Sequence, residues 1–198
     1  MSDPLALHVA ELAACRRCPG MVGPPVAPPP VRSRVFLVGQ APGPREASHG
    51  RPFAWTAGRQ LFRWFATLGV DEETFRSRVY MAAVCRCFPG KASSGGDRVP
   101  SRDEIAACSA WMRAELDLLE PTLIVPVGRL AIETILGPLP LLEAVGRPFQ
   151  RDGRDVIALP HPSGVSTWYK RDPGATRTRE ALATIGAHPA WTATFGPR

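Results

Sequence analysis

Cysteine is the residue type in this chain best suited to hold a metal, and four of its five cysteines are spaced for that task. Cys15-x-x-Cys18 has the spacing of a two-ligand metal motif, while Cys87 and Cys108 are single cysteines much further along. Together these thiols fit a four-ligand site that clamps the N-terminal segment onto the fold. The alternative is a redox pair at Cys15 and Cys18 with inert thiols elsewhere. Spacing does not distinguish Zn²⁺ from a [4Fe–4S] cluster.

A loop rich in glycine and proline follows a buried apolar run and can bring backbone amides close to a ligand. It begins with Gly39-Gln-Ala-Pro-Gly43 and continues through Glu46 and Gly50-Arg-Pro-Phe53 to Ala57-Gly58. No Gly-Lys-Ser/Thr follows, which excludes a Walker loop, and a proline interrupts any dinucleotide fingerprint. The alternative is a tight turn whose glycines serve only a positive φ.

A histidine ends the last apolar run, in the segment Pro160-His161-Pro162-Ser163. At the end of a strand, His161 can donate a hydrogen bond to a developing negative charge. Ser163 can hold a phosphate. The alternative is a structural histidine whose ring nitrogens are satisfied within the fold.

Short apolar runs alternate with helical patterns along the chain, which predicts a parallel sheet covered on both faces. The predicted strands are residues 34–39, 79–84, 122–128 and 156–159. The predicted helices are residues 4–18, 57–68, 101–119 with a capping box, 129–136, and a last helix from Asp172-Pro173 to about 186. Ligands of such sheets bind beyond the carboxyl ends of the strands, where loops 39–56 and 160–169 belong.

The composition is that of a globular protein with a basic surface. The chain has 198 residues, 44% of them hydrophobic, a formal net charge of +6 and a pI of about 9.5. A basic balance favours nucleic acid as partner before an anionic membrane. No apolar run is long enough to span a bilayer, and residues 1–12 lack a signal-peptide pattern. We therefore expect an intracellular, cytoplasmic protein without membrane attachment.

Three ordered motifs resemble those of the iron–sulfur uracil-DNA glycosylases called family 4. The first is Gly39-x-Ala-Pro-Gly43-x-x-Glu46-x-x-x-Gly50-Arg-Pro-Phe53-x-x-x-Ala57-Gly58. The second runs from Val79-Tyr80 through Arg86-Cys87-x-Pro89 to Pro100-x-x-x-Glu104-x-x-x-Cys108, and the third is His161-Pro-Ser163. The likeness extends from about residue 8 to 186. It implies one domain over residues 1–198, with three α/β/α layers around a four-stranded, mainly parallel sheet.

The resemblance also assigns the thiols. It implies a structural [4Fe–4S] cluster on Cys15, Cys18, Cys87 and Cys108, carried in part by an N-terminal segment of residues 1–30. Cys85 is left over, and we expect it to be a small buried hydrophobe.

In this family the target base is flipped out of the DNA into a pocket. By resemblance, Phe53 stacks on the base and backbone amides near Gln40 and Ala41 meet its carbonyls. His161 hydrogen-bonds and stabilises the leaving base, and Glu46 orients or deprotonates the attacking water. The alternative for Glu46 is a salt bridge that stabilises the loop.

The DNA contacts follow from the same resemblance. Ser163 grips a phosphate, and Val165 fills the gap left by the flipped base. Arg51 and Lys170 are candidate phosphate contacts, as are other basic residues nearby: Arg59, Lys91, Arg98 and Arg171. Each is equally plausible as a solvated charge.

Two positions depart from family 4. Gln40 stands where that family has Glu, and Ala83 stands where it has the Asn that reads the uracil edge. Ala82-Ala83-Val84 instead resembles the related family 5, which accepts a wider set of bases. Losing one bidentate reading weakens discrimination by about 1–3 kcal/mol. The loop from Phe88 to Ala107 is longer than usual and lacks histidine, so we predict no crosslink to DNA.

The sequence thus predicts a monomeric, monofunctional glycosylase that acts at the nucleoid on DNA containing uracil, with hypoxanthine or xanthine as further substrates. One alternative is a member of the superfamily that binds DNA with little or no catalysis, in which Gln40 and Ala83 mark a decayed pocket. Another is a zinc or redox protein unrelated to DNA, which would show no salt-dependent DNA affinity.

Overall fold

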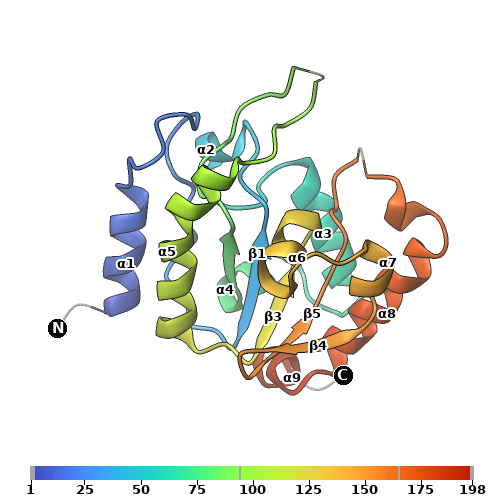
Figure 1. Cartoon of the computed structure of the whole chain (residues 1–198). Coiled ribbons are helices and arrows are strands. Elements are labelled where there is room, and N and C mark those ends of the chain that lie inside the picture. Colours follow the sequence, from blue (N-terminus) through green and yellow to red (C-terminus); the bar gives the residue numbers. More distant parts are fainter. Residues whose placement is uncertain (1–2, 94, 165, 197–198) are drawn as a thin grey trace.

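The computed structural model describes residues 3–93, 95–164 and 166–196, which form a sheet with helices on both faces (Figure 1). The strand order is β2-β1-β3-β5-β4. The bounds are Val35–Gly39 for β1, Tyr80–Ala83 for β2, Leu123–Pro126 for β3, Pro148–Arg151 for β4 and Arg154–Ile157 for β5. Strands β2, β1, β3 and β5 run parallel, and β4 pairs antiparallel with β5.

The sheet therefore has five strands, one more than the four that were predicted. The missed strand β4 lies at the edge, and none of its four residues is buried, so it lacks the continuous apolar run of the other strands. Its connection to β5 is Asp152-Gly153, both with positive φ, which is the most common two-residue hairpin signal. That dipeptide was the signal in the sequence that could have revealed it.

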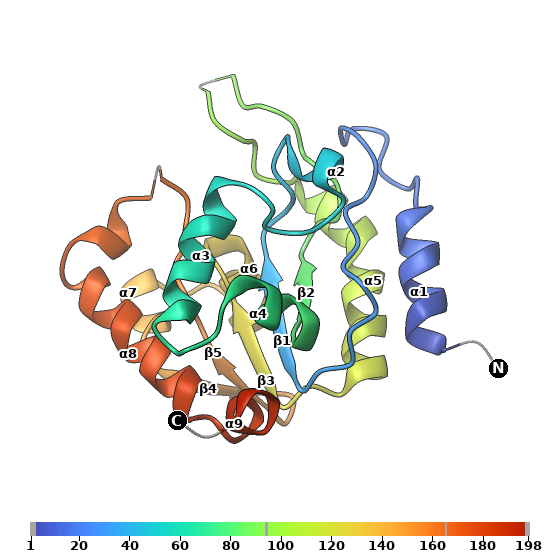
Figure 2. The ribbon, with the colours of Figure 1, turned by 180° about the vertical axis from the view of Figure 1, so that it is seen from behind.

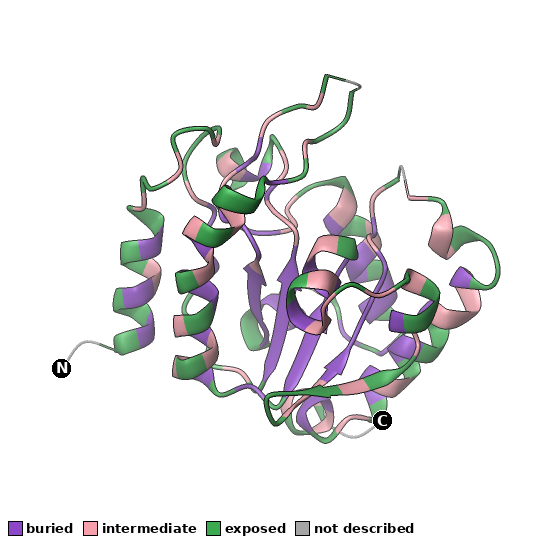
Figure 3. Cartoon of the chain, viewed as in Figure 1, coloured by how far each residue is buried: buried purple, intermediate pink, exposed green. Residues whose placement is uncertain are grey.

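Alternating side chains of the parallel strands supply two separate cores, which confirms the three layers (Figure 3). Val35, Leu37 and their counterparts pack against α3 (Thr56–Ala66), α4 (Glu72–Arg78), α8 (Gly174–Ala187) and α9 (Pro189–Phe195). Phe36 and Val38 face α1 (Pro4–Ala13), α5 (Arg102–Leu119) and α6 (Arg129–Leu136) instead. The sheet is thus closed on both faces, and a ligand can reach it only at its edges.

Helix ends follow local signals. Ser101 and Glu104 form the predicted capping box of α5. Helix α8 starts one residue later than expected, with Pro173 as N-cap while the Asp172 side chain accepts from Thr176 N at 3.1 Å. Helix α1 ends at Ala13, before the first cysteine pair, rather than at 18. The sequence did not predict α4, α9 or the short helices α2 (Glu46–His49), α7 (Leu141–Ala144) and η1 (Trp168–Lys170).

In the described part of the chain, no helix has both the length and the apolar character needed to cross a membrane.

Candidate active site

The predicted pocket loops both follow carboxyl ends of the parallel strands, at one edge of the sheet (Figure 2). The glycine loop leaves β1 and contains α2, and the segment with His161 follows β5. Residues 88–93 and 95–100 belong to a third loop, which projects above the same edge beside α2. Backbone hydrogen bonds join the first two strand ends, since Val84 N donates to Gly39 O at 2.9 Å and Cys85 N donates to Gln40 O at 3.0 Å.

Phe53 is held in a conformation that few non-glycine residues adopt. Its φ is +55°, its N–H donates to Glu46 Oε2 at 3.2 Å, and its carbonyl accepts from Arg76 Nη2 at 3.0 Å. A Cβ at Gly39 would lie 2.7 Å from the Phe53 ring, and one at Gly58 would lie 1.7 Å from the Phe53 carbonyl oxygen. The two glycines therefore permit the close approach that lays this ring over the end of β1.

Glu46 is a buried carboxyl group, only 8% exposed. Burial raises its pKa to about 7, against the opposing effects of backbone hydrogen bonds from Phe53 and Gly43 and of the Arg76 charge. Among the described residues Glu46 forms no ion pair, so its loop contact is a backbone hydrogen bond rather than the salt bridge considered above. A carboxyl group with a pKa near 7 suits general base catalysis at neutral pH.

His161 is oriented by its own loop. Its Nδ1 accepts from Ser163 N at 3.2 Å, which in a neutral ring leaves the proton on Nε2. Burial lowers the pKa of His161, so the neutral form dominates at pH 7, although the Asp97 charge acts in the opposite direction. A Cβ at Gly128 would lie 2.8 Å from His161 Cδ2, so that glycine makes room for the ring. The imidazole is thus a neutral donor through Nε2.

Three residues predicted to surround the base lie at the same edge and are half-buried: Gln40, Ala41 and Ala83. Ala83 ends β2 and is paired in register with Gly39 of β1. Its methyl group offers no hydrogen bond to a base, in contrast to the asparagine of family 4.

The candidate DNA contacts Lys170 and Arg51 already have partners within the chain. Lys170 Nζ donates to Gly164 O at 3.0 Å, and Tyr169 Oη to Ser163 O at 3.5 Å, so both tie the segment around Ser163 to η1. Arg51 already pairs with Glu73 at 3.1 Å and Glu72 at 3.7 Å. The proposed wedge, Val165, lies outside the described residues.

Sequence reasoning missed several residues of this edge. Arg76 of α4 donates to the carbonyls of Pro52 and Phe53, although nothing in its sequence context suggests this role. Trp55 is 40% exposed, and the Arg45 guanidinium lies 4.4 Å from its ring centroid. Asp97, in the loop after the cysteine segment, acts electrostatically on both Glu46 and His161.

The four predicted cysteine ligands lie close to one another. Burial, and then repulsion from Cys108, Cys18 and Cys15, raises the pKa of Cys87 to about 11, so the four predicted ligands share one neighbourhood. Cys85 is buried as expected, but it also hydrogen-bonds Cys108 and thereby lowers the pKa of the Cys108 thiol. Among the described residues, no three His, Cys, Asp or Glu side chains are arranged around a single metal ion.

A buried charge network lies beneath these thiols. The Arg86 guanidinium, between Cys85 and Cys87 in sequence, pairs with Glu115 of α5, and Tyr80 Oη donates to Glu115 Oε1 at 2.8 Å. Arg86 is 1% exposed, and its Nε and Nη1 donate to no group in the described ranges. Two buried donors therefore remain available next to the thiols.

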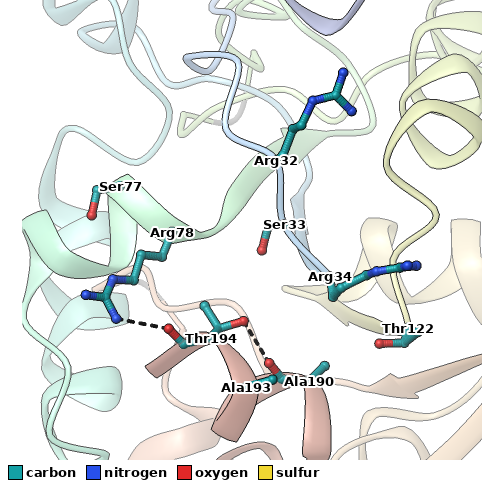
Figure 4. A pocket seen from close by; sticks show the side chains of 9 residues that line it. All are labelled: Arg32, Ser33, Arg34, Ser77, Arg78, Thr122, Ala190, Ala193 and Thr194. Atoms are coloured by element: carbon teal, nitrogen blue, oxygen red, sulfur yellow. Dashed lines mark hydrogen bonds between the residues drawn. The ribbon is translucent and has the colours of Figure 1, made fainter. Parts of the chain in front are cut away.

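A separate cavity lies at the opposite edge of the sheet (Figure 4). It measures about 500 Å³, and its lining includes residues that precede β1, β2 and β3, namely Arg34, Arg78 and Thr122. Its arginines point in different directions, and Arg34 and Arg78 donate to the carbonyls of Glu120 and Thr194. Convergent donors for a ligand are lacking among these residues, so this cavity is not the candidate site.

Comparison with known proteins is consistent with this site. Residues 25–185 match the family model described as the uracil DNA glycosylase superfamily. The chain is similar to a type-4 uracil-DNA glycosylase of Archaeoglobus fulgidus, with 29% identity over 79% of this chain and 80% of the relative. A type-5 uracil-DNA glycosylase of Pyrobaculum aerophilum is 30% identical over 78% and 80%.

A type-4 uracil-DNA glycosylase of Sulfurisphaera tokodaii is also similar, with 30% identity over 64% of this chain and 56% of the relative. Against this and two further type-4 relatives, the chain spans 53% to 65% of the relative's length.

Proposed function

The chain belongs to the uracil DNA glycosylase superfamily, and on that premise we propose that it is a DNA repair enzyme that removes uracil from DNA. It would hydrolyse the N-glycosidic bond and leave an abasic site, without lyase activity. The observation that carries this proposal is that one edge of the sheet holds both a buried carboxyl group, Glu46, and an imidazole, His161, whose Nδ1 accepts from Ser163 N.

The proposed reaction starts from a base flipped into the pocket and stacked on Phe53, with backbone amides near Gln40 and Ala41 at its carbonyls. The C1′–N bond breaks, and its electron pair leaves with the base, whose anion accepts a hydrogen bond from His161 Nε2. Water adds to C1′ and gives its proton to the Glu46 carboxylate. His161 donates as a neutral imidazole in this step, because its burial disfavours the charged form.

The range of bases follows from Ala83. Because a methyl group neither donates nor accepts, it imposes no hydrogen-bond pattern on the base edge. We propose that hypoxanthine and xanthine are accepted beside uracil. Ser163 and Lys170 would hold the DNA backbone, with Val165 as wedge and Arg51 as a further phosphate contact once it leaves its glutamates.

The thiols fit a [4Fe–4S] cluster held by Cys15, Cys18, Cys87 and Cys108. Two observations support the fit: the four thiols repel one another, and two buried Arg86 donors lack a partner among the described residues. A cluster of several irons is wider than one ion, so its thiolates need not surround a single point. When bound, it would crosslink the N-terminal segment to the end of β2 and to α5, a structural role.

We further propose a single domain over residues 1–198 that acts as a monomer on DNA inside the cell. The basic charge of the chain supports the DNA partner.

The test is single-turnover excision from oligonucleotides carrying uracil, hypoxanthine or xanthine, using anaerobically purified protein. We expect uracil release, and a loss of roughly 10²–10³ in rate for His161→Ala because one donor to the leaving base is removed. Phe53→Ala should also slow excision. Binding of uracil-containing DNA without base release would instead identify a non-catalytic DNA-binding member, and excision unchanged in both variants would refute the proposed mechanism.

A further inference from the structure

The segment between Cys87 and α5 is a hairpin whose chemistry the proposed mechanism leaves unused. Lys91 and Asp97 form an antiparallel bridge. Ala92 N donates to Gly96 O at 3.1 Å and Arg98 N to Gly90 O at 2.9 Å. In Figures 1 and 2 this hairpin rises above the carboxyl edge of the sheet, next to α2.

The base of the hairpin is fixed to α5. Arg98 donates through Nη1 and Nη2 to the two oxygens of Glu104, at 2.8 and 2.7 Å, and through Nε to Pro89 O at 2.8 Å. Glu104 also closes the capping box of α5, since it accepts from Ser101 N at 2.7 Å. The bidentate pair and the cap together position the two strands of the hairpin relative to the sheet.

One side chain of the hairpin lies beside the glycine loop. Asp97 Oδ2 lies 3.8 Å from a Cβ built on Gly43, in the loop that carries Glu46. Its Oδ1 accepts from Lys91 Nζ at 2.6 Å, which directs the carboxylate and balances part of its charge. The Asp97 charge reaches both proposed catalytic groups, because it raises the pKa of Glu46 and opposes the lowered pKa of His161.

We propose that Asp97 is a second carboxylate of the active site, a positioning residue delivered by the hairpin that acts on Glu46 and His161. This inference rests on the proposed function. Its negative charge makes Glu46 a stronger base for the attacking water. The long loop of this chain thereby becomes part of the catalytic apparatus.

The charged and polar groups around Glu46 and His161 determine how their pKa values respond to the loss of Asp97. Glu46 faces the positive charge of Arg76 from α4, the negative charge of Asp97 from the hairpin, and the N–H groups of Phe53 and Gly43. His161 faces Asp97 and the N–H of Ser163. The Asp97 charge acts to raise the pKa of Glu46 and of His161, so its removal should lower both pKa values.

The test compares the wild-type holoprotein with Asp97→Asn and with Asp117→Asn, which removes the same charge from an exposed position on α5. For Asp97→Asn we expect the acid limb of single-turnover uracil excision to move to lower pH. The plateau rate should fall about two- to tenfold, a small part of the 10²–10⁴ that a general base supplies. Affinity for DNA should be equal or tighter, because a negative charge near the phosphates is lost.

A second readout does not need activity. The C2 proton of His161, assigned with His161→Gln, should titrate at lower pH in Asp97→Asn than in wild type, and Asp117→Asn should leave it unchanged. An unmoved His161 titration overturns the inference, whether or not the wild type excises uracil. A slower rate with an unmoved acid limb would make the hairpin structural only and would also overturn it. Absence of excision by the wild type with a shifted titration would refute the proposed function alone.

Discussion

Two regions at the same edge of the sheet are held in place by different means. In the cysteine region, defined by residues 15–18, 85–87 and 104–108, the supporting contacts are between side chains: thiols, and beneath them the Arg86–Glu115 pair. In the pocket, defined by residues 39–58 and 160–164, most contacts involve the backbone. There, glycines allow close approach, and Glu46 and Arg76 bind the two ends of the Phe53 residue.

This difference separates stability from catalysis. A buried charge pair costs little while both partners are present and much when one is removed. A loop held mainly through its backbone instead presents a side chain such as His161 without depending on it for the overall fold. Substitutions in the cysteine region should therefore reduce the free energy of unfolding, whereas those at pocket side chains should reduce rate.

The largest effect on stability is expected at Glu115. In Glu115→Ala the Arg86 guanidinium stays buried without its partner, and Tyr80 Oη loses its acceptor. The free energy of unfolding should fall by about 3–5 kcal/mol, as measured by urea denaturation under anaerobic conditions.

Asp117→Asn, two residues along the same helix but exposed, is the matched control and should change stability by less than about 0.5 kcal/mol. A Glu115→Ala protein as stable as the wild type would break the comparison, because the buried pair would then not support the cysteine region.

In the pocket, Glu46→Gln should change the rate of excision and the free energy of unfolding in opposite directions. Excision should fall by roughly 10²–10⁴ because the amide cannot accept the proton of water. The free energy of unfolding should instead rise relative to wild type as the pH increases. The pKa of Glu46 is about 7 in the folded chain, above the ordinary 4.5, so the folded state binds this proton more tightly than the unfolded state. Its stabilising contribution is present below pH 4.5 and is lost as the pH rises through 7.

Glu46→Gln lacks this loss, so from pH 5 to pH 8 its stability should rise relative to wild type by on the order of 2–3 kcal/mol. Denaturation at both pH values, with the exposed Glu143→Gln as control, measures the difference. A constant difference across this range would show that Glu46 is not held protonated by burial.

The sequence predicted the parts of this architecture whose determinants are contiguous. The apolar runs identified the four parallel strands, and the motif around Gly39 and Phe53 identified the pocket loop. The residues that act across the chain were not predictable: Arg76 reaches the loop 23 residues before it, and the Arg86–Glu115 pair joins residues 29 apart. Neither pairing leaves a pattern in the local sequence, because each depends on how the helices pack.

The same reason explains the missed elements. Strand β4 pairs only with β5 and buries none of its residues, so periodicity could not reveal it. Helix α9 has seven residues and packs Trp191 against Phe65, with ring centroids 5.4 Å apart. Such a short helix depends on tertiary packing more than on its own propensity.

The smallest expected effect concerns the outer surface of the pocket loop, where the comparison predicts a binding defect without a folding defect. Trp55 is 40% exposed, and the guanidinium groups of Arg45 and Arg59 lie 4.4 and 6.0 Å from its ring centroid. An exposed aromatic ring with adjacent cations suits stacking on a base and contact with phosphates, and base–aromatic stacking contributes about 1–3 kcal/mol.

We expect Trp55→Ala to weaken binding of uracil-containing DNA about tenfold in fluorescence anisotropy, with an unchanged unfolding midpoint. Leu7→Ala, at a more exposed apolar position on α1, should change neither. If Trp55→Ala lowered the unfolding midpoint while DNA affinity stayed constant, Trp55 would be a structural residue and the separation between the two regions would not extend to the surface of the pocket loop.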